Sequence, residues 1–201
     1  MTASPRDAPT VAAPEDDASL IGRSRVEPEV FAVLYDRHAP FIHRYVRRRL
    51  GDQAADDLVA ETFLAAFRQR RRYDPGRADA RPWLYGIAAN LIGKQRRAET
   101  RMLRALARTG VDPVADSMDR VDARVSAAAS ARELAGALAE LSPGDRDVLL
   151  LIAWADLSYE QVAEALSIPV GTVRSRLNRA RRKVREALGG IDPTRVQEGT
   201  E

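Results

Sequence analysis

A run of basic side chains near the C-terminal end is the feature whose chemistry is easiest to state. Residues 171–188 carry seven arginine or lysine side chains and one acid, although the formal net charge of the chain is only +3. At 100° per residue on a helix, the apolar side chains of this stretch fall on one stripe that must pack inward: Val173, Leu177, Ala180, Val184 and Leu188. The opposite side carries groups that can grip phosphates, bind guanine edges or read adenine: Arg174, Ser175, Asn178, Arg181, Arg182 and Arg185.

The residues that precede this basic helix favour DNA binding over an ordinary solvated surface. Ser158 to Gln161 form a capping box that opens a short helix, and Ser167-Ile168-Pro169 then makes a turn. A short helix, a tight turn and a longer basic helix make a helix-turn-helix. The sequence therefore predicts that the second helix enters the major groove.

A large apolar residue stands among charges on the helix that we expect from residue 54 to residue 73. One side of this helix is apolar and should be buried, with Val59, Thr62, Phe63, Ala66 and Tyr73. The other side holds Asp57, Glu61, Leu64 and Arg68. A single exposed leucine is unremarkable. Beside two acids, however, Leu64 also fits an anchor for a protein partner with a basic surface.

A third helix, expected to begin near Arg81, combines aromatic and basic side chains. Its residues include Trp83, Tyr85, Asn90, Lys94, Arg96 and Arg97. Aromatic rings beside bases can stack on unpaired nucleotides and hold their backbone. We expect Trp83 to serve mostly in the core.

Several kinds of chemistry are not expected. The chain has no cysteine, which excludes disulfides and thiolate metal sites. His38 and His43 are five residues apart on one helix, so they do not share a face for a metal. No nucleophile with an activating base is recognisable. We expect no enzyme activity, cofactor, metal or small-molecule substrate. Without a long apolar run or signal core, we expect a cytoplasmic protein that does not enter a membrane.

The apolar periodicity is helical throughout, which predicts an all-α fold of two small helical domains joined by a flexible linker. Breakers at Gly51 and at Asp74-Pro75-Gly76 separate the first helices, and Ser142 caps a later one. The expected divisions are a disordered tail at 1–28, a first domain at 29–98, a linker at 99–119, a second domain at 120–190 and a short tail at 191–201.

These motifs together resemble the extracytoplasmic-function group of the sigma-70 family. The stretch DDLVAETFLAAFRQRRRYDP resembles the polymerase-binding helix of sigma region two. RPWLYGIAANLIGKQRRAE resembles the adjoining segment, which melts and reads the downstream, or minus-ten, promoter element. Residues 141–188 resemble region four, which reads the upstream, or minus-35, element. With the helix before them these motifs cover residues 29–188.

The resemblance implies a role for particular residues. The core-polymerase contacts would be Asp57, Leu58, Glu61 and Leu64. The loop from Asp74 to Asp79 would take a flipped base together with Asn90, and Lys94 and Arg97 would join them at the downstream element. The upstream element would be read by Arg174, Ser175, Asn178, Arg179, Arg181 and Arg182. The implied partners are core RNA polymerase and promoter DNA. Whether an anti-sigma factor is a third partner stays open.

The expected function is therefore that of an alternative sigma factor that directs promoter-specific transcription initiation. Two weak DNA readers would gain affinity by engaging one promoter simultaneously. A stand-alone dimeric helix-turn-helix regulator is one alternative, but it needs a dimerisation face and leaves Leu64 unexplained. An enzyme with a DNA-binding tail is another. Co-purification with core RNA polymerase separates the first class from both. The promoters and the inducing signal stay open.

Overall fold

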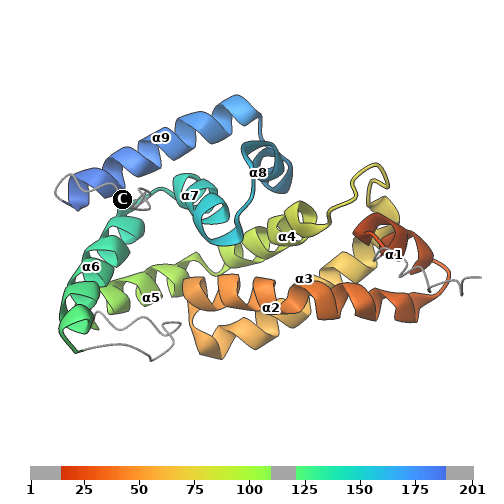
Figure 1. The fold of residues 1–201 in the computed structure, drawn as a ribbon, viewed down its shortest axis with the longest axis horizontal. Coiled ribbons are helices and arrows are strands. Elements are labelled where there is room, and N and C mark those ends of the chain that lie inside the picture. The colour runs from red at the N-terminus through yellow and green to blue at the C-terminus, as the bar shows by residue number, and fades with distance from the viewer. Residues whose placement is uncertain (1–14, 110–120, 189–201) are drawn as a thin grey trace, which may run out of the picture.

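A computed structural model describes residues 15–109 and 121–188, and these residues fold into helices (Figure 1). The helices are α1 (Asp17–Arg23), α2 (Phe31–Leu50), α3 (Asp52–Gln69), α4 (Arg81–Lys94), α5 (Arg96–Thr109), α6 (Val121–Glu140), α7 (Pro143–Ala155), α8 (Tyr159–Leu166) and α9 (Val170–Ala187). Short 3-10 turns at Pro28–Val30 and Arg70–Arg72 complete the described elements. The prediction of an all-α fold with two helical domains is confirmed.

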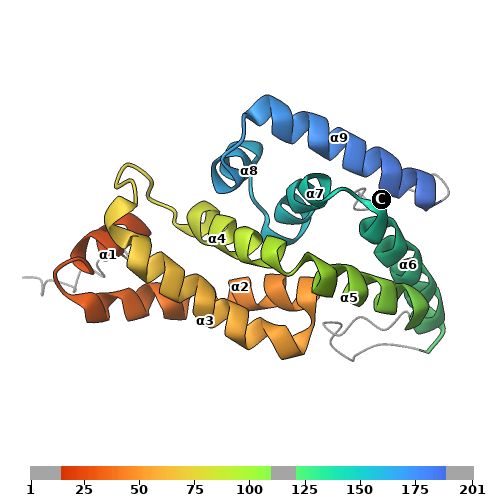
Figure 2. The same cartoon turned by 180° about the vertical axis from the view of Figure 1, so that it is seen from behind.

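The first domain is a layer of α2, α3 and α4, with α1 across one end (Figure 2). Gly51 adopts a φ of 85°, which a glycine reaches without strain, and so turns the chain sharply from α2 into α3. The layer is held by fully buried apolar side chains that recur every three or four residues, including Leu34, Ile42, Val46, Leu58, Leu84 and Ile92.

The second domain contains α6 to α9 and begins its inner helices at side-chain caps. The Ser142 hydroxyl accepts from the Asp145 N–H, and Ser158 and Gln161 form the predicted capping box. Each cap satisfies backbone N–H groups that the first helical turn leaves without partners. Asp156 and Ser167 close α7 and α8 in the left-handed conformation, both with a φ of 52°. The caps predicted from the sequence are therefore confirmed.

The two domains pack against each other. α5 lies along α6 at one end of the molecule, and α8 lies across α4 nearer the middle (Figures 1 and 2). A Cβ added to Gly86 of α4 would lie 2.3 Å from the carbonyl oxygen of Ala165 in α8. Only the absence of a side chain at Gly86 lets these two backbones approach so closely.

Two predicted segment boundaries are wrong. The tail expected at 1–28 is structured from residue 15, because Leu20 and Ile21 of α1 are buried in the first domain. The linker expected at 99–119 is helical as far as Thr109, because Glu99 and Leu103 of α5 are buried. The remaining residues of both predictions, 1–14 and 110–119, lie outside the described residues, as do 191–201.

Candidate nucleic-acid and polymerase interfaces

The α9 helix presents the basic face that the sequence predicts. Its inward stripe is buried, since Val173, Leu177, Ala180 and Val184 are each no more than 1% exposed. Five of the six side chains predicted to read the upstream element are exposed, namely Arg174, Ser175, Asn178, Arg179 and Arg182. The helix is thus fixed along one stripe while the opposite side stays open to a ligand.

Two of the predicted upstream residues are placed differently. Arg179 makes a two-pronged contact with Asp145 at the start of α7, with N–O distances of 2.8 and 2.7 Å. The Asp145 carboxyl is 2% exposed, and hydrogen bonding from Arg179 outweighs burial to hold its pKa below its usual value. Arg181 is half-buried and borders an apolar hollow with Leu138 and Trp154. Arg179 is therefore exposed but tied to α7, whereas Arg181 is partly covered by the domain.

Helix α3 exposes Leu64 to solvent, as the sequence predicts. Leu64 is 48% exposed, and Asp57 and Glu61 are exposed on the same side of the helix. Leu58 is different, because its side chain is only 1% exposed and belongs to the core between α2, α3 and α4. Leu58, predicted to contact polymerase, is therefore a core residue in this structure, and its contact with polymerase stays a prediction.

The loop between α3 and α4 has a defined shape although most of its side chains are exposed. Asp74 accepts from the Gly76 N–H at 3.0 Å, and the Tyr73 hydroxyl donates to the Arg77 carbonyl at 2.6 Å. Asp79 accepts from the Arg81 N–H at 2.9 Å. Trp83, expected mostly in the core, is partly buried and packs its ring on Tyr73 at a centroid distance of 4.9 Å.

The other downstream candidates stand apart from this loop. Asn90 is exposed on α4, nine residues after its first residue, which corresponds to about 13 Å along the axis. Lys94 and Arg97 are exposed where α4 passes into α5. Assigning α5 to a linker also missed two further exposed arginines, Arg101 and Arg104. With Arg97 they follow the i, i+4, i+7 spacing of one helical face, which was the signal that could have found them.

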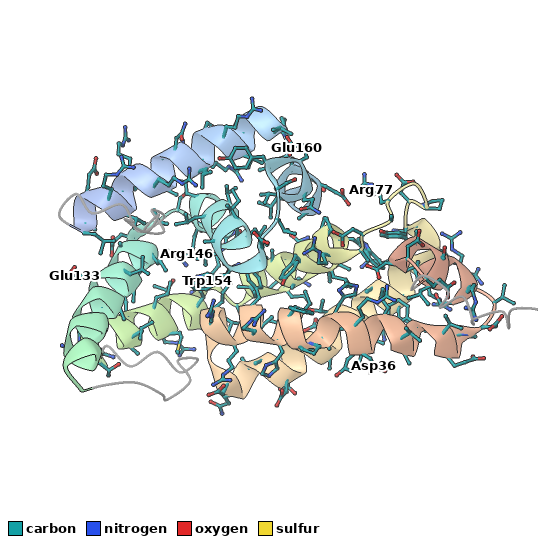
Figure 3. All side chains as sticks on the ribbon, viewed as in Figure 1. Asp36, Arg77, Glu133, Arg146, Trp154 and Glu160 are labelled. Carbon is teal, nitrogen blue, oxygen red and sulfur yellow. The ribbon has the colours of Figure 1, made fainter. Side chains whose placement is uncertain are left out.

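Helix α8 covers one side of the 74–80 loop. Arg77 forms an ion pair of 2.5 Å with Glu164, and the Gln161 amide donates to Asp79 at 3.0 Å. Figure 3 shows Arg77 at this loop, next to α8, the helix that carries Glu160. The candidate reader of the downstream element and the helix-turn-helix are therefore in direct contact.

A buried ionic cluster joins the domains further along, and no motif in the sequence indicates it. Glu99 of α5 is 2% exposed and accepts from Arg49 of α2 at 2.6 Å and from Arg146 of α7 at 3.0 Å. Arg49 also donates to Asp147 at 2.7 Å. Two guanidinium and two carboxylate groups thus compensate each other's charge. Nearby, the guanidinium of Arg48 in α2 lies 5.5 Å from the centre of the α7 Trp154 ring, which points toward α2 in Figure 3.

Each of the two histidines pairs with a carboxylate. His38 pairs with Asp17 at 2.8 Å and His43 with Asp56 at 3.0 Å. Over residues 15–109 and 121–188, no three His, Cys, Asp or Glu side chains gather as metal ligands would. None of the helices in the same residues is long and apolar enough to cross a bilayer.

Known proteins with the same pattern were found by sequence and by fold. The model of "Sigma-70 region 2" matches residues 34–102, and that of "Sigma-70, region 4" matches residues 131–184. The chain is 34% identical over 179 residues to ECF RNA polymerase sigma factor SigL of Mycobacterium tuberculosis, covering 89% of this chain and 99% of SigL. It is 31% identical over 169 residues to RNA polymerase sigma factor CarQ of Myxococcus xanthus, covering 82% of this chain and 92% of CarQ.

A solved structure gives the corresponding likeness in three dimensions. CnrH, in its complex with the cytosolic domain of CnrY, superposes with a TM-score of 0.61 at 27% sequence identity. The match covers 86% of this chain and 97% of CnrH, so it includes both helical domains rather than the helix-turn-helix alone.

Proposed function

The chain belongs to the extracytoplasmic-function group of the sigma-70 family, and we propose how its surfaces divide the work of an alternative sigma factor that directs transcription initiation. Helix α3 holds core RNA polymerase. The 74–79 loop and the exposed side of α4 take the downstream element. Helix α9 reads the upstream element. The protein acts in the cytoplasm, where promoter DNA and core polymerase are found.

The single observation that carries this proposal is the two-sided character of α9. Its apolar stripe is sealed into the domain, whereas Arg174, Asn178 and Arg182 are exposed on the other side. Arginine can bind a guanine edge with two hydrogen bonds, and asparagine can do the same with adenine. We assign direct contacts to Arg174, Asn178 and Arg182 and a positioning role to Arg179, whose guanidinium ties α9 to α7 through Asp145.

The polymerase contact is proposed from the exposed apolar side chain on α3. Leu64 offers an anchor that can enter a pocket, while Asp57 and Glu61 select a basic rim around that pocket. Leu58 is buried and so lies outside this exposed surface.

The downstream reader is proposed to combine the loop with a basic track. Asp74 and Asp79 would shape the seat of a flipped base, whose extrusion costs a few kcal/mol that the seat must offset. Asn90 and Lys94 would follow the strand along α4. The exposed arginines of α5, Arg97, Arg101 and Arg104, are placed to hold phosphates beyond it.

The packing of α8 on the loop implies an order of events. The seat around Asp79 can receive a base only after the contacts from Gln161 and Glu164 separate. We propose that binding of core polymerase brings the domains to the separation that a promoter requires. CnrH binds the cytosolic domain of a second protein, CnrY. We propose by analogy that an anti-sigma factor also binds this chain.

In-vitro transcription with core RNA polymerase tests the proposed function. The full chain is added to core polymerase on a library of genomic fragments, and the 5′ ends of the transcripts are mapped. Core polymerase alone is the control. We expect new transcripts that start at a fixed distance from two shared sequence elements. If the chain neither binds core polymerase nor changes the start sites, the proposal is wrong.

A further inference from the structure

We propose that Asp17 is a positioning residue that fixes the 74–80 loop in the shape in which it reads the downstream element. The segment 15–27 is then part of the DNA reader, although it precedes the sigma-70 region 2 match at residues 34–102. The inference rests on the proposed function of the loop. It explains why a polar side chain is buried in the first helix of the described chain.

The Asp17 carboxylate connects three elements. One oxygen accepts from the backbone N–H of Ala80 at 2.9 Å and from His38 of α2 at 2.8 Å. The other accepts from Arg37 at 2.6 Å. The backbone N–H of Asp17 also donates to the carbonyl of Ala78 at 3.2 Å. A single residue of α1 thus holds two backbone groups at the end of the loop where α4 begins.

The start of the loop is held by the same segment. Arg25, which follows α1, donates to the carbonyl of Tyr73 at 3.2 Å. In return, Arg70 donates to the carbonyl of Ser24 at 3.1 Å. Both ends of the loop are therefore attached to residues 17–25, and the attachment is to backbone atoms, which set the path of the chain.

Besides these attachments, the loop is held by its own hydrogen bonds at Tyr73 and Asp74 and by the contacts of Arg77 and Asp79 with α8. Residues 74–78 are exposed, so no buried apolar side chain anchors them. Residues 17–25, which form this clamp on the loop, are themselves held in place, because Leu20 and Ile21 of α1 are buried in the core at 3% and 0% exposure. A loop ordered before it binds loses less conformational freedom when a base arrives, and so binds it more tightly and selectively.

The test compares Asp17→Asn with Asp16→Asn in the full chain bound to core polymerase. Asp16 is exposed, and asparagine replaces aspartate well as a helix N-cap. Each variant loses one negative charge. Asp17→Asn loses it at the contact with the loop, and Asp16→Asn loses it at the neighbouring residue. Open-complex formation is measured on a promoter in which each downstream base is varied, and on a second set with varied upstream bases.

We expect Asp17→Asn to reduce the preference for the best downstream base by about two- to tenfold. The upstream preference and the affinity for core polymerase should stay the same, and Asp16→Asn should match the unaltered chain in every measurement. A uniform loss at all downstream sequences, or no loss, would show that Asp17 only stabilises the fold and would overturn the inference.

Arg25→Ala provides a second variant, because it removes the clamp at the other end of the loop without altering Asp17. It should relax the same downstream preference. Asp74→Ala changes the loop itself, so it tests the proposed function of the loop separately from the role of the clamp. If Asp74→Ala leaves the preference unchanged, the proposed function of the loop fails. If Asp74→Ala relaxes it but neither Asp17→Asn nor Arg25→Ala does, the inference about the clamp fails alone.

Discussion

Gly86 of α4 faces the backbone carbonyl of Ala165 in α8 so closely that a Cβ at Gly86 would lie 2.3 Å from the carbonyl oxygen. A backbone oxygen cannot turn aside as a flexible side chain can. We therefore predict that Gly86→Ala forces α4 and α8 apart, although helix propensity alone would make alanine the better residue by about 1 kcal/mol. Hydrogen exchange of the α8 amides should become faster.

Gly93→Ala is the matched control for this change. Gly93 lies on the same helix, and a Cβ added there meets nothing within 4 Å. Its α8 amides should exchange as slowly as those of the unaltered chain. Equal exchange in the two variants would mean that the α4–α8 contact does not hold the domains together.

Replacement of the exposed leucine on α3 should disrupt polymerase binding without unfolding the chain. Leu64→Glu removes the apolar anchor and adds a third acid beside Asp57 and Glu61. We expect the affinity for core polymerase to fall at least about thirtyfold, as for an interface hot spot. Val26→Glu, at an apolar side chain that is 85% exposed, is the control and should bind normally. A lower melting temperature for Leu64→Glu would instead indicate a core role.

The first exposed arginine of α9 should contribute to recognition of one base. Arg174→Ala should cost about 1–3 kcal/mol on the preferred upstream element and relax the preference at one position. Loss of a phosphate contact would instead weaken binding to all sequences equally and lower its salt dependence. Lys183→Ala, half a turn around the helix, is the control. Unchanged affinity and preference for Arg174→Ala would contradict the placement of α9 in the groove.

The buried ionic cluster should be intolerant of losing its central carboxylate. Glu99→Gln leaves Arg49 and Arg146 with one fewer buried negative charge, and we expect a loss of about 3–5 kcal/mol of unfolding free energy. Glu133→Gln, at an exposed acid on α6, should change stability little. Denaturant unfolding measures both. Comparable stabilities would show that water enters the cluster and satisfies the arginines.

The clamp at Asp17 predicts a dependence of stability on acid pH. Burial raises the pKa of Asp17, but hydrogen bonds from His38, Ala80 and Arg37 outweigh it and lower the pKa to about 2 from the usual 3.8. A carboxyl with a lowered pKa stabilises the folded state above its unfolded pKa and loses that effect as the pH falls toward the folded value.

We therefore expect the unaltered chain to exceed Asp17→Asn in unfolding free energy by on the order of 2 kcal/mol near neutral pH. The difference should shrink between about pH 4 and pH 2. Asp36→Asn, at an exposed aspartate of α2, loses the same charge and is measured in parallel as the control. A difference that does not vary with pH would mean that Asp17 keeps its ordinary pKa.

Local signals in the sequence were sufficient to predict most helices and their caps. Ser158 and Gln161 are three residues apart, so the sequence itself brings them together once a helix starts. The buried stripe of α9 follows in the same way from helical spacing. The exposed face of α3 could be predicted at Leu64, because that side chain stands among charges. The burial of Leu58 could not be predicted in the same way, because resemblance to a family's binding helix does not say which way each side chain points.

The contacts that define the candidate sites depend on partners far along the chain. Asp17 reaches Ala80, and Glu99 meets Arg49 and Arg146, which become neighbours only after the helices pack. A single sequence holds no record of such pairing. The tail predicted at 1–28 and the linker predicted at 99–119 were therefore too long. Their sequence neighbours alone make Asp17 and Glu99 resemble ordinary solvated acids.

The contact between α8 and the 74–80 loop has a consequence for how tightly the free chain can bind a promoter. On the proposed function of the 74–79 loop, the packed and the promoter-bound arrangements exclude each other at Arg77 and Asp79. The apparent dissociation constant therefore equals the intrinsic one divided by the fraction of molecules that are open. By reciprocity, whatever favours the packed state weakens DNA binding by the same factor. The residues between the domains thus set how much sigma factor a cell needs before transcription begins.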